Sequence, residues 1–395
     1  MADVLRVLTL NSIAPLGLKR LPAERYSVGT HVPSPDAILV RSQDMHSMDI
    51  PESVKAIGRA GAGTNNIPVA AMNRRGVPVF NAPGANANAV KELVLAGMLL
   101  AARNLVPAIR FVDALAGSSE EINTAVEDGK KHYSGVELPH HVLGIIGLGR
   151  IGSLVADAAI KLGMNVHGYD PEITVDAAWS LPSQVRKAHS IEEVMRNSEF
   201  VTIHVPLVEQ TRNLIDAKRI GLMKHGAVLL NFSRDGIVDN NAVVQALDAK
   251  RLKAYVCDFP SATFRGHPGV IALPHLGAST REAEDNSAVM VVEQLRDYLE
   301  NGNVRNAVNF PDVNMARESP YRLGIANANV PNMVGQISTA VAQAGLNIHN
   351  MLNKSKKDMA YTLVDVDSPV PAKVIDRIAA IEGVLAVRYL PAESI

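Results

Sequence analysis

The stretch that decides the fold is Val-Leu-Gly-Ile-Ile-Gly-Leu-Gly-Arg-Ile-Gly at residues 142–152. An apolar run leads into the pattern Gly-x-Gly-x-x-Gly, which is typical of a buried strand, a tight turn and the first turn of a helix. Gly147 permits the turn, Gly149 lets the backbone approach a pyrophosphate, and Gly152 permits close packing of the helix on the strand. The N–H groups at such a helix N-terminus attract an anion.

A second predicted strand follows this helix and ends at Asp170. A carboxylate at that strand end can bind both ribose hydroxyls of NAD, and it would repel the 2′-phosphate of NADP. The sequence therefore predicts a Rossmann-like nucleotide-binding domain that uses NAD.

Short β-branched runs alternate with helical patterns over most of the chain, which indicates parallel sheets built from βαβ units. The predicted strands are Ala2–Leu8, Ala37–Val40, Val54–Gly58, Val142–Ile146, Asn165–Tyr169, Phe200–Val205, Ala227–Asn231, Ala254–Cys257 and Val270–Leu273. The predicted helices between them include Lys91–Arg103, Ser153–Leu162, Ile191–Arg196 and Asn241–Ala249.

A different rhythm begins after the polar stretch 310–320. The predicted elements are strand Tyr321–Ala326, helix Val334–Gln343, strands Leu346–Asn353 and Ala360–Val366, helix Ala372–Ala380 and strand Val384–Tyr389. This βαββαβ order is typical of a small ferredoxin-like module. We expect three parts: a leading α/β unit, a central nucleotide domain and a C-terminal domain.

Composition narrows the functional classes. With 395 residues, 47% of them hydrophobic and 20% charged, the chain is expected to be a globular protein of two or three domains. A net charge of -1 without a basic run argues against a nucleic-acid partner. The single cysteine, Cys257, excludes an internal disulfide and a cysteine-based zinc site, and no metal is predicted. We expect a cytoplasmic protein with no membrane partner, because Leu93–Ala102 is too short to span a bilayer and the N-terminus lacks a signal-peptide layout.

Polar residues follow several predicted strands at the sheet edge where ligands of open α/β sheets bind. Arg234 can grip a carboxylate with two hydrogen bonds, and His275 can move a proton near neutral pH. Asp258 ends another of these strands. For His204 we expect a structural role instead, capping its strand or filling the core.

The leading unit carries a candidate anion site. Arg59-Ala60-Gly61-Ala62-Gly63-Thr64-Asn65 follows a predicted strand, and its small residues expose successive N–H groups. Arg41 ends a neighbouring predicted strand. The alternative, less favoured from the sequence alone, is that both arginines face solvent.

Three of these segments resemble the signatures of the D-isomer-specific 2-hydroxyacid dehydrogenase family. They are the glycine pattern with Asp170, the run 231–239 around Arg234, and the run 273–280 around His275. With the loop after Arg59, the run 80–84 and the C-terminal module, the resemblance extends over essentially the whole chain. It is to those members of the family that act on D-3-phosphoglycerate and carry a C-terminal ACT domain.

The resemblance implies an α/β fold of two Rossmann-like parallel-sheet domains plus a ferredoxin-like ACT domain. The implied divisions are a discontinuous substrate domain (1–100 and 285–312), an NAD domain (101–284) and an ACT-like regulatory domain (320–395). The implied reaction is NAD-dependent oxidation of D-3-phosphoglycerate to 3-phosphohydroxypyruvate, the entry to L-serine synthesis.

Residue roles follow from the same resemblance. Arg234 would bind the substrate carboxylate and carbonyl oxygen, and His275 would be the acid/base. The implied cofactor contacts are Gly147, Gly149, Arg150, Ile151, Gly152, Asp170, Ser233, Asp258, Gly277 and Ala278. The implied substrate contacts are Ala60, Gly61, Ala62 and Gly63 for the carboxylate, with Arg41 and Arg59 near the phosphate.

Two departures from the family pattern concern the reaction. No glutamate stands between Asp258 and His275 to pair with the histidine, so Asp258, a water or a backbone carbonyl would have to orient the imidazole. Asp235 follows Arg234 where the family generally has glycine.

Two alternative functions stay open. One is a dehydrogenase or reductase for another 2-hydroxy acid, such as a hydroxypyruvate reductase, and the other is a non-enzymatic NAD-sensing protein of the corepressor type.

The C-terminal module suggests an effector. Asn329 and Asn347 match asparagines that bind L-serine in related ACT domains, and Asn327 stands where a histidine is common. An asparagine amide can donate to a carboxylate and accept from an ammonium. We expect a homo-oligomer, dimer or tetramer, with Lys130 and Lys131 as candidate phosphate ligands for a neighbouring subunit; a purely structural dimerisation domain is the alternative.

Overall fold

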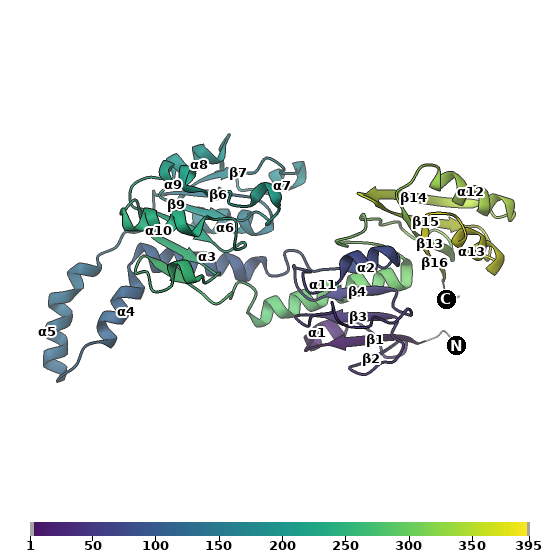
Figure 1. Cartoon of the computed structure of the whole chain (residues 1–395), viewed down its shortest axis with the longest axis horizontal. Coiled ribbons are helices and arrows are strands. Elements are labelled where there is room, and N and C mark those ends of the chain that lie inside the picture. Colours follow the sequence, from purple (N-terminus) through teal and green to yellow (C-terminus); the bar gives the residue numbers. More distant parts are fainter. Residues whose placement is uncertain (1–3, 393–395) are drawn as a thin grey trace. The chain divides into compact units, whose positions relative to one another are not determined.

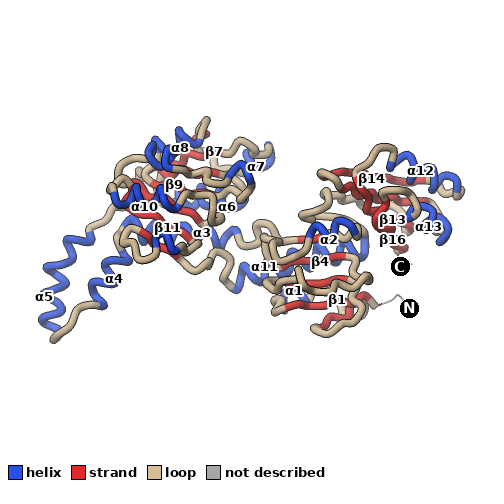
Figure 2. The backbone as a smooth tube through the Cα atoms, viewed as in Figure 1, coloured by secondary structure: helices blue, strands red, loops and turns tan. Residues whose placement is uncertain are grey.

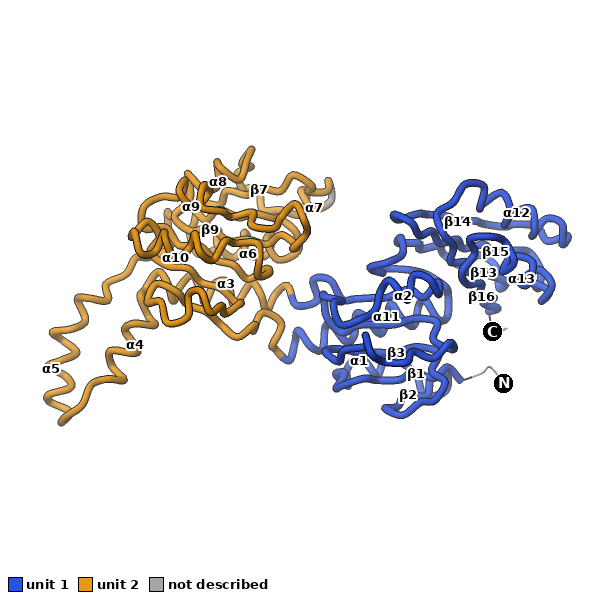
Figure 3. The backbone as a smooth tube through the Cα atoms, in the orientation of Figure 1, with its two compact units in different colours: residues 1–86, 281–395 blue, residues 87–280 orange. Residues whose placement is uncertain are grey.

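The structure is a computed structural model that describes residues 4–392, apart from the side chain of Asp176. The chain forms two compact units: Met1–Asn86 with Arg281–Ile395, and Ala87–Thr280 (Figure 3). We call the first the substrate unit and the second the nucleotide unit, after the roles that the sequence leads us to expect, and each is described by itself. Residues 2 and 3 of the predicted first strand lie outside the described residues.

The nucleotide unit contains a seven-stranded parallel sheet in the order β12-β11-β10-β9-β6-β7-β8. Figure 2 shows strands of this sheet, in red, among the helices of the unit. Its strands are β6 Val142–Ile146, β7 Asn165–Tyr169, β8 Arg186–Lys187, β9 Phe200–Ile203, β10 Ala227–Asn231, β11 Leu252–Cys257 and β12 Val270–Ala272. β6 lies between β7 and β9, so the strand order reverses beside it. Ligands of doubly wound sheets bind at the carboxyl ends of the strands at such a reversal.

Helices cover both faces of this sheet. They are α3 Ala87–Ala102, α6 Arg150–Lys161, α8 Ile191–Asn197, α9 Ala217–Leu222 and α10 Asn240–Asp248, together with the short α7 Val175–Trp179. One core contains the buried faces of α3 and α6, and the other contains those of α8, α9 and α10. Because strands buried on both faces must be apolar throughout, β9 and β10 are buried at every position.

The substrate unit contains a five-stranded parallel sheet in the order β2-β1-β3-β4-β5. Its strands are β1 Leu5–Leu10, β2 Tyr26–Gly29, β3 Ala37–Val40, β4 Ala56–Arg59 and β5 Val79–Phe80. The helices are α1 Pro15–Leu18, α2 Val69–Arg74 and α11 Arg281–Asn301. α1 packs closely on α11: a Cβ added at Gly17 would lie 2.6 Å from the Cβ of Ala288.

The C-terminal part of the same unit is a four-stranded antiparallel sheet in the order β14-β15-β13-β16, with β13 Tyr321–Ala328, β14 Ile348–Lys356, β15 Met359–Val366 and β16 Val384–Pro391. Helices α12 Met333–Gln343 and α13 Ala372–Ala379 cover one face (Figure 1). The predicted α/β fold class, two parallel-sheet domains with a ferredoxin-like C-terminal domain, is confirmed.

The other face of the C-terminal sheet belongs to the core of the substrate unit. Met359, Tyr361 and Leu363 of β15 are buried in one cluster with Tyr298 of α11 and Phe310. The rings of Tyr298 and Tyr361 lie 6.2 Å apart, and those of Phe310 and Tyr361 lie 6.3 Å apart. One continuous apolar core therefore joins the C-terminal sheet to the parallel sheet.

Arginines of the C-terminal part also cap the end of α11. Arg388 donates to the carbonyl oxygens of Tyr298 (3.0 Å) and Leu299 (2.8 Å), Arg317 donates to that of Glu300 (3.1 Å), and Arg322 donates to that of Asn301 (3.1 Å). The last carbonyls of a helix have no intrahelical partner and carry partial negative charge. These cations therefore stabilise the C-terminus of α11.

Several features differ from the prediction or lie outside it. β13 continues to Ala328, two residues beyond the predicted end at Ala326, because Asn327 and Ala328 pair with Ala360 and Met359. α4 Leu105–Asp113 and α5 Ser119–Gly129, which project as a pair in Figure 1, and the long α11 were not predicted. The division of the units after Asn86 places all of α3 in the nucleotide unit.

Across residues 4–392, no single helix has the length and apolar character needed to span a membrane. Only α3 and α4 taken together, as a pair bent by 66°, satisfy that criterion of length and composition.

Candidate active site

The glycine turn after β6 has the backbone geometry that its sequence predicts. Gly147 has φ +93°, and a Cβ added there would lie 2.7 Å from the carbonyl oxygen of His204. At Gly152 an added Cβ would lie 2.0 Å from the carbonyl oxygen of Gly147. Apart from the adjoining residues of the chain, no atom lies within 4 Å of the Cβ position at Gly149, which is the N-cap of α6. The N-terminus of α6 is therefore not covered by other parts of this unit and has room for a pyrophosphate.

Asp170 is held beside this turn. Its Oδ2 accepts a hydrogen bond from the backbone N–H of Leu148 at 2.9 Å, and its Oδ1 accepts one from the N–H of Glu172 at 3.0 Å. Each carboxylate oxygen keeps a lone pair for a further donor. The glycine turn and the carboxylate that would bind ribose thus form one connected structure, and these residues fit NAD.

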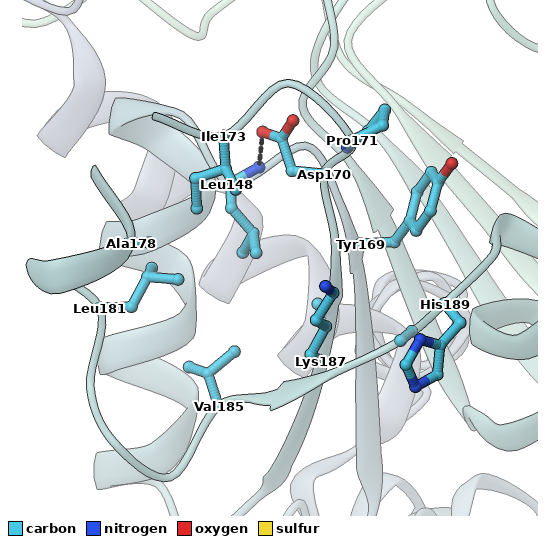
Figure 4. Close-up of a pocket in the computed structure, with 12 residues that line it drawn as sticks. Leu148, Tyr169, Asp170, Pro171, Ile173, Ala178, Leu181, Val185, Lys187 and His189 are labelled. Atoms are coloured by element: carbon cyan, nitrogen blue, oxygen red, sulfur yellow. Dashed lines mark hydrogen bonds between the residues drawn. The ribbon is translucent and has the colours of Figure 1, made fainter. Parts of the chain in front are cut away.

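A pocket of about 500 Å³ extends from Asp170 along β7 and β8 (Figure 4). Ile173, Leu181 and Val185 give it an apolar wall, and Figure 4 shows the hydrogen bond from Leu148 to Asp170 at its rim. A flat apolar ring joined to a ribose at Asp170 could be accommodated there.

His275 stands on the loop that follows β12. Its backbone is left-handed, with φ +57°, and its imidazole contacts the ring of Phe259 edge-on at a centroid distance of 5.1 Å. Left-handed backbone is uncommon for residues other than glycine, although histidine, like asparagine and aspartate, adopts it more often than most. Such residues occur at functional sites and at tight turns.

Asp258 shapes this loop. Its buried carboxylate accepts from the backbone N–H groups of Leu276 (2.7 Å) and Gly277 (2.8 Å), and its carbonyl oxygen accepts from the N–H of His275 (3.1 Å). Between residues 4 and 392, no carboxylate forms a hydrogen bond or ion pair with the imidazole of His275. The contacts of Asp258 thus favour a role in positioning the loop.

Arg234 lies in the turn that follows β10, and β10 is the strand next to β11 in the sheet. Its guanidinium is exposed and donates to the carbonyl oxygen of Ser233 at 2.7 Å. The turn is fixed by the buried Asn231, whose Nδ2 donates to the carbonyl oxygen of Arg234 (2.9 Å) and whose Oδ1 accepts from the N–H of Ser233 (3.1 Å). The Ser233 hydroxyl donates to the carbonyl oxygen of Ile203 at 3.0 Å. The carboxylate of Asp235 lies 3.5 Å from Nδ2 of Asn240.

Two other reactive side chains of this unit are buried. Burial lowers the pKa of His204 to about 3, and its Nε2 lies 3.0 Å from the hydroxyl of Thr202. Burial raises the pKa of the Cys257 thiol to about 11. His204 is therefore neutral and Cys257 a thiol near neutral pH, in keeping with structural roles.

In the substrate unit, Arg41 and Arg59 stand at the carboxyl ends of adjacent strands, because Val40 pairs with Arg59 in the register of β3 and β4. Asn66 connects them: its Oδ1 accepts from Nε of Arg59 at 3.1 Å, and its Nδ2 lies 3.4 Å from the carbonyl oxygen of Arg41. The Arg41 guanidinium donates to Oε1 of Glu284 at 2.6 Å.

The loop Ala60–Gly63 lies beside the same strand end. Ala60 N–H donates to the carbonyl oxygen of Val40 at 2.8 Å, and the carbonyl oxygen of Gly61 accepts from the N–H of Ala82 at 3.0 Å. Gly61 has φ +151°, and a Cβ added there would lie 2.4 Å from the Arg59 guanidinium. The absence of a side chain at Gly61 therefore lets Arg59 fold over the loop.

Sequence reasoning missed three residues that contact the candidate site residues: Asn66, Asn231 and Glu284. Asn231 closes the turn in which Arg234 stands, and an asparagine at the end of a buried strand could have indicated this. Nothing local to Glu284 indicates its partner, because 243 positions separate it from Arg41.

The three candidate effector residues differ in accessibility. Asn329 and Asn347 are exposed, and Asn329 donates to the carbonyl oxygen of Lys357 at 3.0 Å. Asn327 is completely buried and donates to the carbonyl oxygen of Ala328 at 2.7 Å. Of the three, only Asn329 and Asn347 are placed to meet a ligand from solvent. The described part of the chain contains no cluster of three or more His, Cys, Asp or Glu side chains that could hold a metal ion.

Comparison with known proteins identifies the class. Residues 95–277 match the family described as D-isomer specific 2-hydroxyacid dehydrogenase, NAD binding domain. A solved structure of D-2-hydroxyisocaproate dehydrogenase has the same fold, with a TM-score of 0.64 at 21% identity over 77% of this chain and all of that one. The chain belongs to the D-isomer-specific 2-hydroxyacid dehydrogenase family, and its nucleotide unit is an NAD-binding domain.

Within the family, several relatives are named D-3-phosphoglycerate dehydrogenase. D-3-phosphoglycerate dehydrogenase of Haemophilus influenzae is 32% identical over 85% of this chain and 81% of its own length, and that of Escherichia coli is 33% identical over 86% and 82%. The enzyme of that name from Methanocaldococcus jannaschii is 35% identical over 79% of this chain, which spans 58% of that relative's length. A structure of NAD⁺-bound 3-phosphoglycerate dehydrogenase from Entamoeba histolytica matches 78% of this chain and 99% of its own, with 25% identity and a TM-score of 0.59.

Proposed function

We propose that this chain oxidises D-3-phosphoglycerate to 3-phosphohydroxypyruvate with NAD⁺, the first step of L-serine synthesis. The observation that carries the proposal is the succession of Arg234, Asp258 and His275 after three neighbouring strands, β10, β11 and β12, of an NAD-binding sheet. An anchoring cation and a proton acceptor are the two groups that oxidation of a 2-hydroxy acid requires from a protein.

His275 acts as the general base, and its imidazole takes the proton of the C2 hydroxyl. Arg234 binds the substrate carboxylate and stabilises the charge that develops on the C2 oxygen. NAD⁺, held by the glycine turn and Asp170, supplies the hydride acceptor. Asp258 fixes the N–H groups of Leu276 and Gly277, and through them the direction of the His275 loop.

The substrate unit supplies recognition of the phosphate. Arg41 and Arg59 would bind a dianionic phosphate, and the N–H groups of the loop Ala60–Gly63 would bind the carboxylate. Two cations at one strand edge favour a phosphorylated substrate over hydroxypyruvate or an unphosphorylated 2-hydroxy acid. The similarity to enzymes named D-3-phosphoglycerate dehydrogenase supports the same choice.

The direct test is an initial-rate assay with NAD⁺ and a panel of D-3-phosphoglycerate, D-glycerate and D-lactate, with hydroxypyruvate and NADH for the reverse direction. We expect the highest kcat/KM with D-3-phosphoglycerate. A higher value with hydroxypyruvate would identify a reductase for that acid. NAD binding without turnover of any of them would identify a sensor.

Cofactor selectivity tests the role of Asp170. We expect NAD to be strongly preferred over NADP, because the carboxylate of Asp170 binds the ribose hydroxyls and repels a 2′-phosphate. Asp170→Ala should reduce that preference about tenfold or more, which corresponds to about 1.4 kcal/mol or more. The measurement is the ratio of kcat/KM values for the two cofactors. Asp157→Ala, which removes an exposed carboxylate from α6, is the control and should leave the ratio unchanged. Equal efficiency with both cofactors in the unmodified protein would contradict the assignment.

We also propose a homo-oligomer, dimer or tetramer, in which α4 contacts a second subunit. Leu105, Ile109 and Val112 of this helix are 39%, 57% and 53% exposed, and none of its residues is buried. Apolar side chains gathered on one projecting helix mark a surface that an identical chain can cover.

The C-terminal domain is proposed to bind L-serine through Asn329 and Asn347. We expect calorimetry to detect serine binding to the purified protein, and Asn347→Ala to weaken it roughly tenfold or more, because the lost amide leaves an ammonium or carboxylate unpaired. Inhibition by serine should weaken in parallel, since coupling between two sites requires binding. No heat of binding at millimolar serine would leave the domain a purely structural role.

A further inference from the structure

The carboxylate of Glu284 forms an ion pair with Arg41, one of the two arginines proposed to bind the substrate phosphate. Nη2 of Arg41 lies 2.6 Å from Oε1 of Glu284, and this contact joins the end of β3 to the first turn of α11. Both residues are in the substrate unit. The Arg41 side chain is 38% exposed and that of Glu284 is 41% exposed, so solvent and solutes reach the pair.

The backbone around Arg41 is fixed without Glu284. The N–H groups of Ser42 and Gln43 donate to Oδ1 of Asn11 at 3.2 and 2.6 Å, and Nδ2 of Asn66 donates to the carbonyl oxygen of Gln43 at 2.7 Å. Removing the carboxylate would therefore leave the strand end in place and change chiefly the charge that faces the guanidinium.

We propose that Glu284 is a specificity-determining residue, an internal counter-ion that the substrate's distal phosphate must displace from Arg41. The proposal rests on the proposed function. A phosphate dianion forms stronger, paired hydrogen bonds with a guanidinium than one carboxylate oxygen does, so it can compete for Arg41. An unphosphorylated 2-hydroxy acid has no group to exchange with Glu284, and Arg41 stays paired when it binds.

The magnitude of the effect follows from the exposure of the pair. An exposed ion pair contributes about 0.2–1 kcal/mol, so its loss to the incoming phosphate raises the KM by up to about fivefold. Glu284 thus weakens phosphate recognition to a moderate degree and does not abolish it.

The test is Glu284→Gln, which keeps an oxygen that can accept from Arg41 and removes the charge. We expect the KM for D-3-phosphoglycerate to fall about two- to fivefold with kcat within twofold of the unmodified enzyme. The KM for D-glycerate, which has the same carbon skeleton without the phosphate, should stay unchanged. Raising the ionic strength should reduce the difference between the variant and the unmodified enzyme, because salt screens exposed charges.

Glu282→Gln is the matched control. Glu282 is exposed in the same first turn of α11, so this change removes an equal charge from the helix N-terminus away from Arg41. It should alter neither KM. A higher KM for D-3-phosphoglycerate in Glu284→Gln would show that Glu284 orients Arg41 for the substrate, and an equal change for both substrates would show a structural role; either result overturns the proposal.

Inorganic phosphate separates this proposal from the choice of substrate. As an inhibitor of D-glycerate oxidation it should bind about two- to fivefold more tightly to Glu284→Gln than to the unmodified protein. If D-3-phosphoglycerate is not a substrate, the proposed function fails, yet the phosphate measurement still tests the pair. Unchanged inhibition by phosphate would overturn the counter-ion role.

Discussion

Replacing His275 with alanine is expected to lower kcat by about two to four powers of ten, the range that general acid–base catalysis contributes. The imidazole is the proton acceptor in the proposed reaction, and its loop keeps the left-handed backbone at His275 through contacts of Asp258. NAD binding, measured by calorimetry, should change little. His225→Ala, at an exposed histidine of the same unit, is the control and should keep full turnover.

Asp258→Asn extends this experiment. Both carboxylate oxygens of Asp258 accept backbone hydrogen bonds from the loop, and an amide can accept only at its oxygen. We therefore expect NAD binding to weaken at least as much as kcat falls in Asp258→Asn.

For His275→Ala, a loss of kcat smaller than tenfold would contradict the assignment of this histidine as the base.

Replacing Arg322 with alanine is expected to lower the free energy of unfolding of the substrate unit by about 3–5 kcal/mol, the cost of leaving a buried charge without its partner. Arg322 and Asp365 are both completely buried and joined by hydrogen bonds of 2.6 and 2.8 Å. The other donors of the guanidinium reach the carbonyl oxygens of Asn301, Met315 and Ala316. Urea unfolding followed by circular dichroism measures the change.

The double variant Arg322→Met with Asp365→Leu removes both charges and keeps apolar volume. It should be markedly more stable than the single variant, because no uncompensated charge remains. Lys161→Ala, which breaks an exposed pair with Asp157, should change stability by less than about 0.5 kcal/mol. A double variant no more stable than Arg322→Ala would mean that packing around the side chain, rather than charge pairing, is what is lost.

Most of the fold could be predicted from the sequence because its signals are local. The apolar run before Gly147 and the alternation of strand and helix patterns predict the nucleotide sheet, and the βαββαβ order predicts the C-terminal domain. α11 has no such signal, since Ser287, Ala288 and Gln294 lie on its buried face and weaken the helical period.

The sequence predicts the positions of Arg234 and His275 in the fold, but not their partners. The strand pattern placed both residues just after strand ends, and they follow β10 and β12 in the structure. The direction of the Asp258 carboxylate depends on a loop 18 or 19 positions later, and the pairing of Arg41 with Glu284 depends on how α11 packs. Contacts between distant segments depend on tertiary packing. The sequence of either segment alone therefore does not predict them.

The continuous core beneath the C-terminal sheet has a consequence for how this architecture can evolve. Gain or loss of residues 320–392 in a single step would be destabilising, because Tyr298 and Phe310 would be left facing water. The carbonyl oxygens of Tyr298, Leu299 and Asn301 would also lose the hydrogen bonds that Arg388 and Arg322 donate. A lineage that lacked them would need polar residues at these positions, so the two parts can change only together.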